Sequence, residues 1–76
     1  METIVVRTPH AGGPALKEAR VAIGMTQTEL AERAQVGRTW LSQFEEGLKL
    51  SAPLDMVFRV IAELAVTIEI QAVRLR

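Results

Sequence analysis

The fold of this chain is decided by the stretch Thr26–Gly47, TQTELAERAQVGRTWLSQFEEG. It opens with a capping box, because the Thr26 hydroxyl can accept a hydrogen bond from the Glu29 amide while the Glu29 carboxylate reaches back to the Thr26 amide. This pattern predicts a helix over about Gln27–Ala34. The apolar face of that helix is expected to hold Leu30, Ala31 and Ala34.

The apolar period breaks at Val36 and Gly37 and resumes on a second helix, expected over about Arg38–Glu46 and ended by Gly47. Helices this short are unstable alone in water, so they must pack on each other and on further helices. The second helix would bury Leu41, Phe44 and Leu48 and present Arg38, Thr39, Ser42 and Gln43 outward. A rigid polar face of this width fits the major groove of DNA, so the pattern is typical of a helix-turn-helix.

The rest of the chain predicts an all-α domain of four main helices with short strands at its ends. We expect an N-terminal strand and linker over 1–13, the helix-turn-helix domain over 14–65, and a C-terminal strand with a basic tail over 66–76. The first helix is expected over Pro14–Ile23, with Gly24 ending it. Its inner face would hold Leu16, Ala19 and Ile23.

The fourth helix is expected after Ser51, which can cap it, with Pro53 tolerated in the first turn. Its apolar stripe follows helical spacing and is predicted to face the core. The stripe comprises Leu54, Val57, Phe58, Ile61 and Leu64.

Strands are expected at both ends, over about Thr3–Arg7 and over the alternating segment in which Val66, Ile68 and Ile70 share one face. Exposed strand edges invite pairing, and 49% apolar residues are many for 76 residues. We therefore expect a homodimer joined through these strands. The alternative is that both strands pair within one chain.

Composition narrows the function classes. Nine basic and nine acidic side chains give a net charge of zero, so DNA affinity would depend on a few well-placed cations. There is no cysteine, and the single histidine, His10, lies in a Gly/Pro-rich turn, so we expect no metal site and no cofactor. Without a nucleophile–base pair, a phosphate loop, a signal peptide or a membrane-length apolar run, we expect a cytoplasmic protein that is not an enzyme and does not enter a membrane.

The segments TQTELAERA and RTWLSQFEEG resemble the Xre or phage-repressor-type helix-turn-helix proteins. VVRTP before the first helix, LSQFEEG, and a β segment after the fourth helix are similar to the HipB-like antitoxin-repressors. The resemblance implies a lambda-repressor-like fold, double-stranded DNA as partner, and a dimer that represses its own operon from a palindromic operator. It also implies a second role, the neutralisation of a HipA-like kinase toxin. In that case the chain would be a protein-interaction module first and a DNA-binding protein second.

Residue roles follow from the same resemblance. It implies base contacts by Arg38, Thr39 and Gln43, whose side chains suit guanine, the thymine methyl and adenine respectively. It implies contacts to DNA phosphates by Gln27, Ser42 and Lys49, and an ion pair between Arg20 and Glu45 that holds the second helix of the motif in place.

Three positions depart from the family pattern. Gln35 stands where the turn usually has glycine, and a left-handed conformation there would cost about 1 kcal/mol or more. Ala65 stands where relatives tend to end the fourth helix with glycine. Trp40 lies between the inner and outer faces of its helix, and we expect it to be partly buried.

Overall fold

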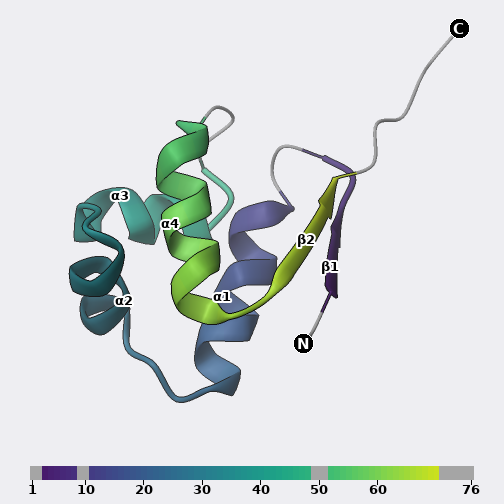
Figure 1. Cartoon of the computed structure of the whole chain (residues 1–76). Helices are drawn as coiled ribbons and strands as arrows, with labels where there is room; N and C mark the ends of the chain where they lie inside the picture. Colours follow the sequence, from purple (N-terminus) through teal and green to yellow (C-terminus); the bar gives the residue numbers. More distant parts are fainter. Residues whose placement is uncertain (1–2, 9–10, 49–51, 71–76) are drawn as a thin grey trace, which may run out of the picture.

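The computed structural model describes residues 3–8, 11–48 and 52–70, except for the side chains of Ile68 and Ile70. Within these ranges four helices form the body of the molecule, and a two-stranded sheet covers one side of it (Figure 1). The all-α class with terminal strands, predicted from the sequence, is confirmed. In chain order the elements are β1 (Thr3–Val6), α1 (Gly12–Ala22), α2 (Gln27–Ala34), α3 (Arg38–Glu45), α4 (Leu54–Leu64) and β2 (Thr67–Ile70).

The helix-turn-helix is formed by α2 and α3. The predicted capping box is present at the start of α2, with the Glu29 amide donating to the Thr26 hydroxyl and the Thr26 amide donating to the Glu29 carboxylate, both at 3.1 Å. Gln35 ends α2 in the left-handed conformation, with φ 57° and ψ 47°. Gly37 is extended rather than left-handed and precedes α3, so the strained residue of the turn is Gln35 itself.

The core lies where the inner faces of the four helices meet the covered face of the sheet. α2 packs against α4 and α3, and α1 packs against α3 and α4. The buried apolar residues are Ile4, Val6, Leu16, Ala19, Leu30, Ala31, Ala34, Leu41, Phe44, Val60 and Leu64.

The α1–α3 contact is a direct backbone approach. A Cβ atom added at Gly13 would lie 1.6 Å from the Phe44 carbonyl oxygen. Gly13 is therefore the residue that lets the start of α1 rest on the end of α3. Its helical position also corrects the expected linker, because α1 begins at Gly12 and not at Pro14. Pro14 is the third residue of the helix and is tolerated there because amides of the first turn have no intrahelical acceptor.

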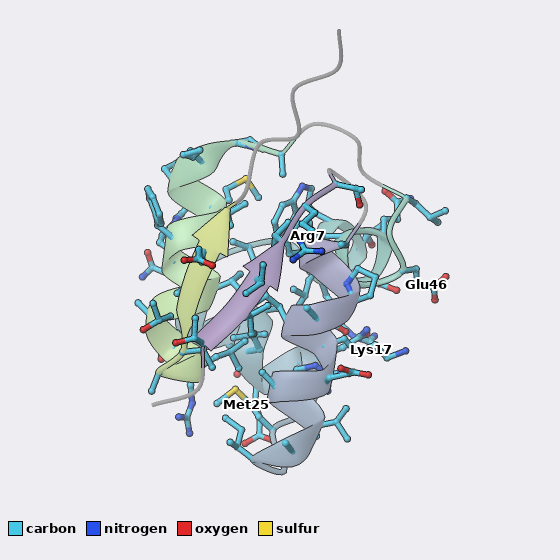
Figure 2. All side chains as sticks on the ribbon, turned by 90° about the vertical axis from the view of Figure 1, so that its right-hand side faces the viewer. Arg7, Lys17, Met25 and Glu46 are labelled. Atoms are coloured by element: carbon cyan, nitrogen blue, oxygen red, sulfur yellow. The ribbon has the colours of Figure 1, made fainter. Side chains whose placement is uncertain are left out.

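The strands pair with each other in parallel, with Ile4 opposite Ile68 and Val6 opposite Ile70. Figure 2 shows β1 crossing in front of α1 and β2 lying towards α4. The pairing is the within-chain alternative, so the strands do not need a second chain to form a sheet. β1 ends at Val6 and β2 begins at Thr67, which leaves Arg7 and Val66 outside the strands.

Several predicted core positions are wrong. Ile23 follows α1 as its C-cap and is exposed, because the chain turns away at Gly24 with φ 76°. Leu48 is exposed because α3 ends at Glu45, one residue earlier than expected, before Gly47 with φ 77°. On α4, Leu64 is buried as predicted, but Leu54 and Phe58 are exposed, because the helix turns Val60 inward in their place.

Other sequence predictions fall outside the described residues or take a different form. The predicted cap Ser51, His10 and the arginines of the tail lie outside the described residues. Ala65 takes the left-handed C-cap conformation of α4, with φ 52°, at the place where the resemblance implies a glycine. Trp40 is half-buried and stacks on Phe44, with ring centroids 4.9 Å apart.

Candidate nucleic-acid interface

A shallow hollow of about 360 Å³ lies between the start of α2 and the outer face of α3. Five predicted DNA-contact residues line it together: Gln27, Arg38, Thr39, Ser42 and Gln43. Arg38, Thr39 and Gln43 are exposed, and Gln27 and Ser42 are half-buried. The structure therefore brings Gln27, at the start of α2, next to four side chains of α3. Lys49, the sixth predicted contact, lies outside the described residues.

α3 holds its polar residues outward because its apolar residues are fixed beneath. Leu41 is fully buried and Phe44 nearly so, while the stacked Trp40 covers the flank of the helix. A helix anchored by one face presents the opposite face with little freedom to rotate. The predicted base-contact residues therefore stand on a rigid support.

A buried hydrogen-bond network fixes the end of α3 to α1. The Arg20 Nε donates to Glu45 Oε2 at 2.7 Å, and its Nη2 donates to Glu45 Oε1 at 2.9 Å. The remaining Arg20 nitrogen, Nη1, donates to the Met25 carbonyl oxygen at 2.8 Å, in the turn before α2. Figure 2 shows Met25 near the lower end of α1. This two-point ion pair thus ties α1, α3 and the α1–α2 turn together.

Gln27 connects this network to the hollow. Its Nε2 donates to Glu45 Oε1 at 2.9 Å, so the side chain faces the buried carboxylate on one side and lines the hollow on the other. A carboxamide nitrogen carries two hydrogens, and its oxygen accepts. Gln27 can therefore hold Glu45 and still offer one N–H and one oxygen to a ligand in the hollow.

Two further contacts shape the motif. The Thr26 amide donates to the Glu29 carboxylate, and this hydrogen bond, with the one from the Thr26 side chain, lowers the pKa of Glu29. The cap is therefore formed with an ionised carboxylate at neutral pH, at the helix end where negative charge is favourable. From α4, Arg59 donates to the Gln35 carbonyl oxygen at 3.3 Å and so contacts the turn between α2 and α3.

Three contributors to this site were not predicted from the sequence. They are the hydrogen bond from Gln27 to Glu45, the Gly13 approach to α3, and the Arg59 contact to the turn. Each joins residues from different helices, so local periodicity carries no signal for them. Of these three contacts, only the one at Gly13 left a trace in the sequence, because a glycine pair directly before Pro14 is unusual at a helix start.

All five side chains that line the hollow can form hydrogen bonds to a ligand. Arg38 is the charged member of the lining set, and the others are amides and hydroxyls. Within the described ranges there is no group of three or more His, Cys, Asp or Glu side chains placed to hold a metal ion. No helix in the same ranges has the length and hydropathy to cross a membrane.

Comparison with known proteins identifies the family. A helix-turn-helix (HTH_3) family model matches residues 16–71, which include all four helices from Leu16 onward. No curated protein matches the sequence significantly.

Two crystal structures of the clp gene regulator ClgR from Corynebacterium glutamicum are similar at 32% identity, with TM-scores of 0.72 and 0.71. Each match covers 78% of this chain, and it covers 62% and 74% of the respective ClgR chains. The first ClgR chain thus extends well beyond the matched part. The family match, which spans residues 16–71, shows that the chain belongs to the helix-turn-helix (HTH_3) family.

Proposed function

We propose that the chain is a sequence-specific transcriptional repressor that binds double-stranded DNA as a homodimer and inserts α3 into the major groove. The observation that carries this proposal is the hollow in which Gln27, Arg38, Thr39, Ser42 and Gln43 converge on an exposed face. A dimer would place two copies of α3 about 34–36 Å apart, or a multiple of that distance, on a palindromic operator.

Each lining residue has a role that fits its chemistry. Arg38 can donate to guanine O6 and N7 together, and Gln43 can pair with adenine N6 and N7. The Thr39 methyl can contact a thymine methyl, while Ser42 and Gln27 donate to phosphates. Because Arg38 is the charged member of the set and the chain has no net charge, most of the affinity must come from specific contacts.

The test compares Arg38→Ala with Gln43→Ala, and the double variant, on DNA from upstream of the protein's own gene. Each bidentate contact is worth about 1–3 kcal/mol of discrimination, so the double variant should lose specific binding while its fold stays intact. Arg33→Ala is the matched control, because Arg33 is also an exposed cation of the motif but does not line the hollow. Binding is measured by titration at fixed salt on operator and scrambled DNA. If the double variant keeps its preference for operator DNA, α3 is not the reading helix.

The antitoxin role is a second proposal and rests on the HipB-like resemblance. It is supported by the strands β1 and β2 that flank the helices, as the resemblance implies. A HipA-like kinase encoded beside the gene would be the partner. It should co-purify with the chain, and the complex should survive Arg38→Ala combined with Gln43→Ala. Failure of such a kinase to bind would remove the antitoxin role and leave the repressor role standing.

A further inference from the structure

The outer face of α4 is apolar although nothing in the described chain covers it. Leu54 and Phe58 are 58% and 62% exposed, and Ala62 continues the same stripe at i+8. The inner face is also apolar, with Val60 and Leu64 buried in the core. At 100° per residue, the apolar residues of α4 span roughly 240° of its circumference. A helix that is apolar over most of its circumference is typical of one that is buried on both sides.

The terminal strands do not account for this surface. β1 and β2 pair with each other, and Ile4 and Val6 face the helices, so the sheet uses its own apolar residues within the chain. Of the exposed large apolar side chains in the described ranges, Leu54 and Phe58 share one face of a single helix, α4.

The charges beside the stripe indicate what covers it. Asp55, Arg59 and Glu63 follow the stripe along one flank at i, i+4 and i+8, and the first two form an exposed ion pair with each other at 3.5 Å. If two copies of α4 pack antiparallel about a two-fold axis, Asp55 of each copy meets Arg59 of the other, and Phe58 lies near the centre. An isologous contact needs such a self-complementary surface, with an acidic residue of one copy facing a basic residue of the other.

We propose that the outer stripe of α4 (Leu54, Phe58 and Ala62) is the homodimer interface, with a second copy of this chain as its occupant. The inference deepens the proposed function, which requires a dimer, and assigns that dimer to α4 rather than to the strands. α4 also contacts the turn of the DNA-binding motif through Arg59, so the interface is joined directly to the α2–α3 unit.

The contact is small. Eleven residues of helix extend about 16 Å, so a pair of α4 helices lies at the low end of interface sizes for specific complexes. We therefore expect dissociation in about the micromolar range, and an operator with two half-sites would hold the pair together by raising the effective concentration.

The main experiment measures dimerisation of the full chain without DNA, by sedimentation over a hundredfold concentration range. Phe58→Glu should weaken dimerisation at least tenfold, because a two-fold interface buries the new carboxylate twice. Val21→Glu is the matched control, since Val21 is 59% exposed on a different helix, α1, and should leave dimerisation unchanged. Circular dichroism checks that both variants stay folded.

A charge exchange tests the antiparallel pairing. Asp55→Arg and Arg59→Asp should each weaken the homodimer, and a mixture of the two should form heterodimers in preference to either homodimer. The α4 assignment is overturned if the wild-type chain is monomeric throughout, or if Phe58→Glu dimerises like the wild type. In the second case the proposed dimeric repressor stands and its interface lies elsewhere, with the outer edge of β2 as the next surface to test. Whether α3 reads DNA is tested separately, by the operator preference of the Arg38→Ala and Gln43→Ala variants.

Discussion

Replacing Gly13 with alanine tests the most demanding contact of the fold. Glycine to alanine inside a helix ordinarily stabilises by about 0.5–1 kcal/mol. Here the added methyl would lie 1.6 Å from the Phe44 carbonyl oxygen, whereas Cβ contacts below 3.0 Å are essentially never seen. The obstacle is backbone, which cannot rotate away as a side chain does. The helices α1 and α3 would have to separate by about 1.4 Å or more.

Gly13→Ala should lower the free energy of unfolding by more than ordinary overpacking of a core does. Extra methyl groups in a core cost about 1–3 kcal/mol when side chains can adjust, so a backbone collision should cost about 3 kcal/mol or more. In a domain of this size each kcal/mol lowers the melting temperature by about 4–8 °C, which predicts a fall of about 12 °C or more. A small single core supplies only about 3–5 kcal/mol, so Gly13→Ala should be close to unfolded at 37 °C.

Gly12 provides the matched control in the same helical turn. A Cβ atom there would lie 3.9 Å from the Val6 side chain, which is an ordinary contact. Gly12→Ala should therefore be neutral or slightly stabilising. Both variants are compared by thermal and urea unfolding, followed by circular dichroism and by the fluorescence of Trp40. Melting of Gly13→Ala within about 2 °C of Gly12→Ala would refute the close approach of α1 and α3.

Three further predictions concern single contacts. Glu45→Ala should lower the free energy of unfolding by about 3–5 kcal/mol, because it leaves the buried Arg20 guanidinium unpaired. Glu46→Ala, at the exposed neighbouring position, should change it by less than about 0.5 kcal/mol. Similar urea midpoints for the two variants would contradict the network around Glu45. The lowered pKa of Glu29 means that its cap stabilises α2 above the ordinary carboxyl pKa and is lost as the pH falls through the lowered value. The melting difference between wild type and Thr26→Ala should therefore be present at pH 7 and shrink as the pH is lowered below about 4, and a constant difference would argue against an ionised cap. Gln35→Gly should raise stability by up to about 1 kcal/mol, because glycine accepts φ 57° without strain; an unchanged or lower melting temperature would show that the turn is not strained there.

Local chemistry made much of the motif predictable. Thr26 and Glu29 form their cap from neighbouring atoms, and Gly24 and Gly47 end helices by their own backbone freedom, so these features can be read without the fold. The ends of α2 and the start of α3 follow from such signals to the residue. The arrangement of Arg38, Thr39 and Gln43 on one outward face follows from helical period once α3 is placed.

The sequence by itself determined that α4 is a strongly apolar helix, but only the tertiary structure decided which of its faces points inward. Leu54 and Val60 are equally apolar, and periodicity cannot choose between two apolar faces; packing against α2 and α1 buries Val60 and leaves Leu54 exposed. The same holds for the two strands, whose parallel pairing joins residues more than sixty positions apart. Contacts between distant segments depend on how the helices close around one core, and that closure is not encoded in any local window of the chain.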